Sequence, residues 1–276
     1  MNTTPSLVAV APARTVAVIG AGRLGSVLAR ALVDAGFDVR GPLRRGERIP
    51  RSDIALLCVP DAAIAEAATN ARPHAGLVGH VSGATGLDDV DFSVHPLQTF
   101  TGSEAPGIFR GIGAAIDGRT PSALALARAL AEALGMRPVR IDDAHRAGYH
   151  AAASVASNLV LAVLDAAEQI VGSAGISPAD ARAALAPLVR QTVENWAALG
   201  ADAALTGPIA RGDEQTVARQ RAAIAADDPA LLGLFDALAT QTREIAARRT
   251  AAERAAQPAP DAASSTDSSE STRSAA

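Results

Sequence analysis

Residues Thr15-Val-Ala-Val-Ile-Gly20-Ala-Gly-Arg-Leu-Gly25 decide how this chain folds. A short apolar run leads into three glycines spaced G-x-G-x-x-G, and an alanine-rich helical stretch follows. Gly20 allows a tight turn, Gly22 lets the backbone approach a pyrophosphate, and Gly25 lets the helix pack against the strand. The helix N-terminus attracts phosphate groups. The stretch therefore predicts a dinucleotide-binding strand, turn and helix. Its expected cofactor contacts are Gly20, Gly22, Arg23, Leu24 and Gly25.

Outward from this turn, short apolar runs alternate with helical stretches. Strands are expected at 15–19, 37–40, 53–59, 77–81, 91–95, 113–117 and 137–141, with helices up to about 35 and at 64–70 and 121–134. This alternation is typical of parallel βαβ units. Residues 15–142 are therefore predicted to form an α/β Rossmann-type domain with a parallel sheet.

After residue 142 the chain has no further strand-like run. Helices are expected at 143–172, 178–199, 213–226 and 228–254, which predicts an all-helical domain over 143–255 for substrate binding and dimerisation. Residues 1–14 are expected to be a flexible leader. Residues 256–276, rich in Ser, Ala, Pro and Asp, are expected to be a disordered tail.

The end of the second expected strand bears on the choice between NAD and NADP. NAD-binding proteins place an acidic residue roughly 20 residues after the glycines, where it bonds the ribose 2′-hydroxyl. Here two adjacent arginines, Arg44 and Arg45, stand there instead, and guanidinium groups suit a 2′-phosphate. NADP is the expected cofactor and NAD the lesser candidate. Solvated surface arginines are the plain alternative, and Glu47 is close enough to serve a ribose.

Composition narrows the possible functions. With 49% hydrophobic and 20% charged residues among 276, the chain has globular composition, and its net charge of −4 offers no basic surface for nucleic acid or an anionic membrane. Its single cysteine, Cys58, fits a reducing compartment. We expect no signal peptide and no membrane span, because polar residues interrupt the most apolar stretch, 151–171. A cytoplasmic protein is predicted.

The basic residues restrict the chemistry further. All 25 residues in the Lys+Arg count are arginines. A mechanism that needs a lysine amine, such as Schiff-base formation, is therefore excluded.

Several motifs carry a family resemblance. Leu56-Leu-Cys-Val-Pro60-Asp61 looks like the third strand of β-hydroxyacid dehydrogenases and pyrroline-carboxylate reductases, in which the following loop passes over the cofactor. This resemblance implies cofactor contacts from Val59 and Pro60. The more specific stretches are His80-Val-Ser-Gly-Ala-Thr85, Phe92-Ser-Val-His-Pro-Leu-Gln-Thr-Phe100, Tyr149-His-Ala-Ala-Ala153, Ser157-Asn158 and Ala204-Leu-Thr-Gly-Pro-Ile-Ala-Arg-Gly-Asp213.

Together these stretches resemble bacterial Rossmann-like oxidoreductases with the domain of unknown function 2520 at the C-terminus, over about residues 15–248. The resemblance implies a 6-phosphogluconate-dehydrogenase-like helical domain and a homodimer, but no particular substrate. Ketopantoate reductases, hydroxyisobutyrate dehydrogenases and short-chain dehydrogenases use a catalytic lysine, which this chain lacks. A mechanism like that of pyrroline-carboxylate or imine reductases survives, as does keto reduction with His or Tyr as proton donor.

Three candidate site residues stand near expected strand or helix ends. His95 follows the fifth strand at the edge where open α/β sheets bind ligands. It is a candidate general acid, with a structural hydrogen bond before Pro96 as the equal alternative. Ser82 is expected to bond nicotinamide or substrate, or else to close a turn. Tyr149, the only tyrosine, is a candidate proton donor or a packed aromatic.

A polar stripe is expected along the helix 143–172. His150, Ser154, Ser157 and Asn158 recur there at spacings of three or four. A core position would leave these groups unsatisfied, so we expect them to face a cleft or a subunit partner, with an exposed stripe as the alternative. His150 and Asn158 are candidate catalytic residues, and Ser154 is a candidate for substrate binding.

Further substrate contacts are predicted in the helical domain from Asn195, Thr206 and Arg211, the last as a clamp for a carboxylate. Asp213 is expected to cap the next helix. Trp196 and Cys58 are expected in the core. His74, His80 and Asp61 make no convincing metal cluster, and no metal is predicted.

The chain is thus predicted to be an NADP-dependent oxidoreductase that moves a hydride to or from a small keto, hydroxy or imine substrate in a cleft between its domains. An S-adenosylmethionine-dependent methyltransferase would want an acid at the end of the second strand, where Arg44 and Arg45 stand. A non-catalytic NADP-binding sensor is the other alternative, and an activity assay would distinguish it from an oxidoreductase.

Overall fold

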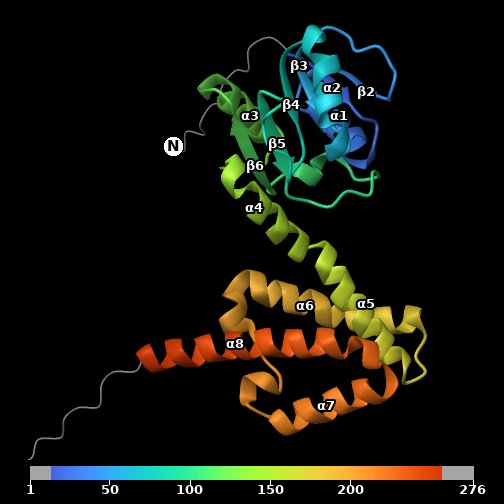
Figure 1. Ribbon diagram of the computed structural model, residues 1–276, viewed down its shortest axis with the longest axis vertical. Coiled ribbons are helices and arrows are strands. Elements are labelled where there is room, and N and C mark those ends of the chain that lie inside the picture. Colours follow the sequence, from blue (N-terminus) through green and yellow to red (C-terminus); the bar gives the residue numbers. More distant parts are fainter. Residues whose placement is uncertain (1–13, 257–276) are drawn as a thin grey trace, which may run out of the picture. The chain divides into compact units, whose positions relative to one another are not determined.

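A computed structural model describes residues 14–256 (Figure 1). The expected leader and tail fall almost wholly outside these residues. The chain divides into two compact units after Val160. The last strand ends at Arg140, close to the expected domain boundary after residue 142. The helix that follows belongs to the first unit, where its Arg146 is buried.

Seven strands of the first unit form one sheet in the order β2-β1-β3-β4-β5-β6-β7. They are β1 Thr15–Ile19, β2 Asp38–Leu43, β3 Ser52–Leu57, β4 Ala75–His80, β5 Phe92–Pro96, β6 Gly113–Gly118 and β7 Arg137–Arg140. The pairs from β2 to β5 are parallel, whereas β5 and β6 are antiparallel. The Rossmann-type fold is confirmed, but its sheet is only predominantly parallel. The β5–β6 connection carries a 3-10 turn and no crossover helix of the kind that parallel neighbours use.

Helices cover both faces of the sheet. β3 shows this directly: Ile54 and Leu56 pack into a core with α1 (Arg23–Asp34) and α3 (Pro121–Ala133), while Ala55 and Leu57 pack against α2 (Ile64–Ala71). Alternate side chains of a strand point to opposite faces, so β3 is buried on both. The strand ends and the loops that follow them are then the places where functional side chains can gather.

The expected single helix over 143–172 is wrong, because it is interrupted at Ala156 and Ser157. The structure has α4 at Asp143–Val155 and α5 at Asn158–Gly172. The Ser157 hydroxyl donates to the Ala153 carbonyl oxygen at 2.7 Å, a local bond that competes with regular helix bonding. The polar stripe is therefore split, with His150 and Ser154 on α4 and Asn158 on α5.

This same region bears on the expectation of no membrane span. By length and composition, Asp143–Gly172 is apolar enough to cross a membrane, with a hydropathy of 1.4. One helix that passes this test is weak evidence for a span, since helices of soluble proteins also pass it. Arg146 in α4 is 2% exposed and hydrogen-bonded to the Rossmann unit.

The second unit is helical. Besides most of α5 it contains α6 (Pro178–Ala204), α7 (Glu214–Asp227) and α8 (Leu232–Ala256), and α8 packs against both α6 and α7. Asp213 caps α7, as expected, by accepting from the backbone N–H of Thr216 at 3.0 Å. Trp196 is 58% exposed, so its expected core position is wrong.

Candidate functional site

The three glycines of the first turn have different surroundings. Gly20 has φ +116°, and a Cβ there would lie 2.2 Å from the Cys58 carbonyl oxygen. A Cβ on Gly25 would lie 1.9 Å from the Gly20 carbonyl oxygen. A Cβ on Gly22 would meet nothing within 4 Å. Gly20 and Gly25 thus hold the turn against the sheet, while Gly22 leaves its backbone open to approach.

The first turn of α1 is suited to an anion. Its cap residue, Gly22, makes no side-chain capping bond, and the turn contains no acidic residue. The first N–H groups of a helix have no partner inside it, and the helix dipole favours negative charge there. Arg23, exposed at the first position, adds a guanidinium group. This helix end fits the phosphates of a dinucleotide.

The glycine turn also lies at the point where the strand order reverses. β1 has β2 on one side and β3 on the other, and ligands of open α/β sheets bind outside the carboxyl ends of strands at such a point. Val59 and Pro60 follow β3 at this edge. Cys58 packs against the core, and burial raises the pKa of its thiol to about 12, so it stays protonated.

Two arginines follow β2, and the nearby acids are engaged locally. Arg44 and Arg45 are exposed in the turn after Leu43. Glu47 accepts from the Arg44 backbone N–H at 2.8 Å, and Asp38 pairs with Arg40 through two bonds of 3.0 and 2.6 Å. The carboxylate of Glu47 is thus part of the turn's own structure.

His95 and Tyr149, both singled out from the sequence, are brought into contact. His95 Nδ1 lies 2.8 Å from Tyr149 Oη, and the two rings meet edge to face. Burial lowers the pKa of His95 to about 4, helped by the charges of His150 and Arg146. Burial also raises the pKa of Tyr149. At neutral pH the two side chains therefore form an uncharged, hydrogen-bonded pair.

His150 completes a cluster over the turn after β4. Its ring centroid lies 6.2 Å from that of His95. A Cβ on Gly83 would come within 2.9 Å of both His95 Nε2 and His150 Cδ2, so only glycine leaves room for the two imidazoles. The structure thus places three of the four candidate catalytic residues together.

Ser82 takes the turn-closing alternative left open by the sequence. Its hydroxyl donates to Thr85 Oγ1 at 3.1 Å and accepts from the N–H groups of Ala84 and Thr85. His80 supports the same turn: Nδ1 accepts from the Ser82 N–H at 3.2 Å, and Nε2 donates to the Gly86 carbonyl oxygen at 3.0 Å. Burial lowers the pKa of His80. His80 was not among the site residues expected from the sequence.

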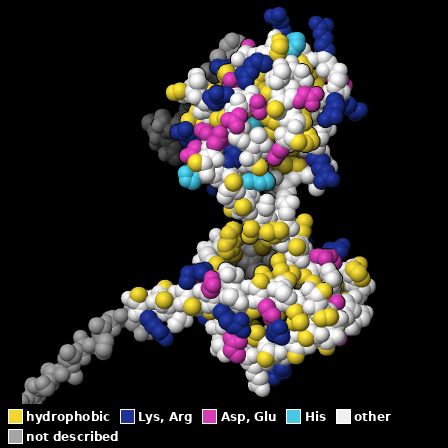
Figure 2. Space-filling view, viewed as in Figure 1, with side chains coloured by type: hydrophobic (Ala, Val, Ile, Leu, Met, Phe, Trp, Pro, Cys, Tyr) yellow, Lys and Arg dark blue, Asp and Glu magenta, His cyan; other side chains and the backbone are white. Residues whose placement is uncertain are grey.

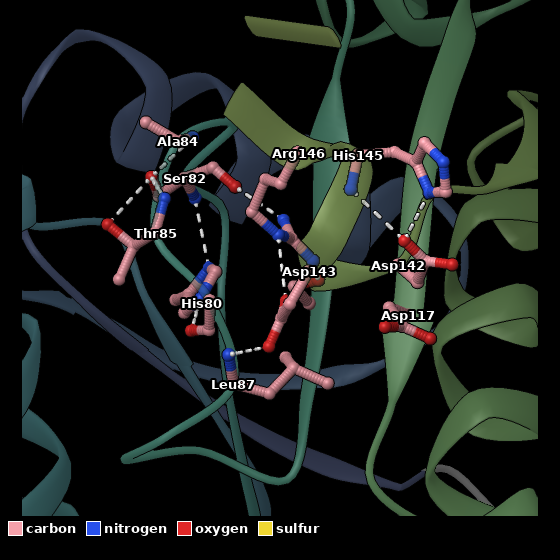
Figure 3. Close-up of polar contacts among 12 residues, drawn as sticks. His80, Ser82, Ala84, Thr85, Leu87, Asp117, Asp142, Asp143, His145 and Arg146 are labelled. Atoms are coloured by element: carbon pink, nitrogen blue, oxygen red, sulfur yellow. Dashed lines mark hydrogen bonds and ion pairs between the residues drawn. The ribbon is translucent and has the colours of Figure 1, made fainter. Parts of the chain in front are cut away.

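A buried arginine that pairs with a carboxylate beside this turn was also not predicted (Figure 3). Arg146, 2% exposed, donates from Nε to Asp143 at 3.1 Å and from Nη2 to Ser93 Oγ at 2.8 Å, with a longer contact of 3.4 Å to the Ser82 carbonyl oxygen. Asp143 also accepts from the Leu87 N–H at 3.0 Å. The available signal was the spacing of Asp143, Arg146, Tyr149 and His150, which share one face of α4.

The other candidate residues lie elsewhere in the chain. Asn158 is exposed at the start of α5, where it accepts from the Ser157 hydroxyl, and Ser154 is half-buried on α4. In the second unit, Asn195 accepts from Gln191 on α6, while Thr206 and Arg211 are exposed between α6 and α7. Their roles stay predictions. The described residues contain no group of three or more His, Cys, Asp or Glu that could hold a metal ion.

One sizeable hollow lies away from this cluster. It measures about 390 Å³, lies between the C-terminal ends of α1 and α3, and has Asp34, Arg110 and Glu132 in its wall. None of the predicted site residues lines it. The chemistry available at the sheet's carboxyl edge makes that edge the stronger candidate site.

Comparison with known proteins supports this organisation. A structure from Bacteroides fragilis, provisionally described as an NADP oxidoreductase, is 23% identical and superposes with a TM-score of 0.70 over 84% of this chain and 99% of its own. Protein TM1727 from Thermotoga maritima is 21% identical, with a TM-score of 0.70 over 86% and 99% of the two chains. The NADP-bound pyrroline carboxylate reductase of Plasmodium falciparum is 10% identical, with a TM-score of 0.51 over 85% and 99%.

These likenesses define the class: a Rossmann-type α/β protein with a helical C-terminal part. Residues 112–242 match the family model described as Domain of unknown function (DUF2520). The resemblance seen in the sequence is confirmed by this match. The match begins one residue before β6 and so includes the last two strands of the sheet. No curated protein matches the chain in sequence.

Proposed function

We propose that this protein is an NADP-dependent oxidoreductase that transfers a hydride to or from a small keto, hydroxy or imine substrate. One observation carries the proposal: an open glycine turn at the strand-order reversal shares its sheet edge with the hydrogen-bonded pair His95–Tyr149. The first feature suits a dinucleotide, and the second supplies groups that can handle a proton.

The residues present fit the cofactor. The open space at Gly22 leaves room for a pyrophosphate against the backbone, and the uncapped start of α1 offers N–H donors. Arg44 and Arg45 are exposed in the turn after β2. Guanidinium groups in this place would bind the 2′-phosphate of NADP better than the ribose 2′-hydroxyl of NAD. Val59 and Pro60 follow β3 at the same edge of the sheet. NADP is therefore preferred, and NAD is the second choice.

The bound nicotinamide would supply or accept the hydride, and the chain's own side chains would manage the charge on the substrate. With its pKa lowered to about 4, His95 is a neutral imidazole at pH 7. We propose that Tyr149 donates its hydroxyl hydrogen to Nδ1, which fixes the tautomer with its proton on Nε2. That N–H then donates a hydrogen bond to the carbonyl or imine heteroatom, where negative charge develops. His150 borders the same space.

Binding measurements test the proposal. NADPH, NADH and S-adenosylmethionine are titrated by calorimetry into the wild-type protein and into the Arg44→Ala and Arg45→Ala variants. We expect NADPH to bind most tightly and to weaken in both variants. A folded protein that binds no NADPH would overturn the proposal, and preferential binding of S-adenosylmethionine would support a methyltransferase. Turnover of keto acids or cyclic imines with NADPH then separates an enzyme from a sensor.

We also propose a homodimer formed through the helical unit and working in the cytoplasm. Large apolar side chains are exposed there, including Leu188, Trp196 and Leu199 on α6 at 64%, 58% and 60%. Figure 2 shows hydrophobic side chains gathered on the helical unit. Contiguous apolar surface of this kind marks interaction sites. Light scattering should give twice the chain mass, and Trp196→Glu should shift it towards the monomer. A monomeric wild-type protein at micromolar concentration would refute the dimer.

A further inference from the structure

We infer that Arg146 is a positioning residue, which fixes α4 against β5 so that the Tyr149 hydroxyl is held on His95. The inference deepens the proposed function and rests on it for the role of the His95–Tyr149 pair. Its geometric basis is independent of any cofactor: a buried guanidinium group whose partners come from three segments of the Rossmann unit (Figure 3).

Two contacts join α4 to β5 side by side. Arg146 Nη2 donates to Ser93 Oγ at 2.8 Å, and Tyr149 Oη meets His95 Nδ1 at 2.8 Å. Ser93 and His95 are two residues apart on the strand and so share a face, while Arg146 and Tyr149 are three apart on the helix and share another. The position of one contact therefore constrains the other.

Asp143 sets the direction of the arginine. It accepts from Arg146 Nε at 3.1 Å and from the Leu87 N–H at 3.0 Å, which ties the first turn of α4 to the loop after β4. A Cβ on Gly86 would lie 2.9 Å from this carboxylate, so the loop passes close to it. Ser93 is fully buried and Arg146 is 2% exposed, so water has little access to the bond between them, whereas the Asp143 carboxylate is 47% exposed.

The arrangement explains why a buried charge is retained next to an imidazole. A lone buried guanidinium would be costly, but here its hydrogen bonds are satisfied by a carboxylate, a hydroxyl and a carbonyl oxygen. Its positive charge favours the neutral form of His95. The charged or titratable groups that act on His95 are His150 and Arg146 from α4, His80 from β4, and Asp61 from the turn after β3, with Tyr149 hydrogen-bonded to the ring.

The consequence can be measured without any substrate. Removing Arg146 takes away one cause of the low pKa of His95, and loosening α4 admits water, which removes part of another. Both changes favour the imidazolium. The same loosening breaks the hydrogen bond between the Tyr149 hydroxyl and His95 Nδ1. The NMR signals of the His95 ring nitrogens should then no longer show a hydrogen-bonded Nδ1.

The experiment is a histidine NMR titration of the full-length protein without cofactor, for the wild type, Arg146→Gln and Arg146→Lys. A control is Arg140→Gln, which removes an arginine paired with Asp117 but 59% exposed. We expect the His95 midpoint to rise by about one pH unit or more in Arg146→Gln. It should rise less in Arg146→Lys, which keeps the charge, and should not move in Arg140→Gln.

Each outcome is decisive. A folded Arg146→Gln protein with an unmoved His95 midpoint and an intact Nδ1 signature overturns the positioning role. If that variant does not fold, Ser93→Ala removes the hydrogen bond of Arg146 to β5, and an unmoved His95 signature in that variant overturns the positioning role instead. Failure of the wild type to bind NADPH would strike the proposed function alone, since the titration needs no cofactor.

Discussion

Alanine at Gly22 is expected to weaken NADPH binding while leaving the protein folded. The added methyl group meets no atom of the chain within 4 Å, and Gly22 has φ −74°, which any residue adopts. Alanine caps a helix less well than glycine, at a cost of up to about 1 kcal/mol. Alanine also lowers the backbone entropy of the unfolded chain, which stabilises the folded protein by about 0.4–1 kcal/mol and offsets the capping cost. Net stability should change by no more than about 1 kcal/mol.

The effect on binding is larger because the open space at Gly22 is where the pyrophosphate is proposed to lie. A methyl group there pushes the phosphates off the N–H donors at the start of α1. Hydrogen bonds to charged groups contribute about 1.5–3 kcal/mol each. Losing one or two of them corresponds to a loss of about 3 kcal/mol, or roughly 100-fold in Kd.

Gly20→Ala is the matched contrast. Its residue would need φ +116° and would place a Cβ 2.2 Å from the Cys58 carbonyl oxygen. Backbone strain and overpacking each cost about 1–3 kcal/mol. This variant should therefore lose about 2–6 kcal/mol of stability, with binding lost because the turn is distorted.

Thermal unfolding followed by circular dichroism measures the stability of both variants, and calorimetry measures NADPH affinity. The expected pattern is a Gly22→Ala protein with near-wild-type Tm and weak binding, beside a destabilised Gly20→Ala protein. Wild-type NADPH affinity in a folded Gly22→Ala protein would refute the placement of the pyrophosphate. Unfolding of the Gly22→Ala protein would refute the conclusion that a methyl group at Gly22 has open space around it.

Three further predictions concern the same edge of the sheet. Tyr149→Phe should lower kcat for a keto or imine substrate by about 10- to 100-fold with NADPH affinity unchanged, and an unaltered kcat would remove Tyr149 from the mechanism. His95 has its pKa lowered from 6.5 to about 4, so the unfolded chain binds its proton first as pH falls. The free energy of unfolding should then decline between pH 6.5 and pH 4 by up to about 3 kcal/mol. Urea unfolding at pH 7 and pH 4.5 should show a smaller decline for His95→Gln than for the wild type. An equal decline in the two proteins would contradict the assignment. Replacing Arg44 and Arg45 together by alanine should weaken NADPH about 10-fold or more and leave NADH unchanged, whereas equal losses for both would place the arginines elsewhere than at the 2′-phosphate.

The fold was predictable because its signals are local. Alternating apolar runs marked the strands, and the helices α1, α2 and α3 began and ended close to their expected positions. What failed was the prediction of one continuous helix over 143–172: the apolar pattern runs on through residues 156 and 157, where the structure ends one helix and begins the next. The direction of β6 depends on the path of a long loop, which strand patterns do not encode.

The candidate site was predictable only as a set of residue types. His95, Tyr149 and His150 could be singled out as groups able to handle a proton, but no sequence pattern places residue 95 against residue 149. Arg146 was not predicted as a site residue because arginine ordinarily lies on the surface. Burial of its charge depends on partners from two other segments of the chain. The exposure of Trp196 likewise depends on what α8 leaves uncovered.

The sequence by itself determined the Rossmann-type turn and the arginines that favour NADP, because each follows from residues adjacent in the chain. It also determined the absence of lysine chemistry, which follows from composition alone. Only the tertiary structure decided that His95 is a neutral imidazole bonded to Tyr149, and that Arg146 lies buried beside them. Burial, hydrogen bonding and a low pKa arise from groups that folding brings together from distant segments. A linear pattern carries no record of that proximity.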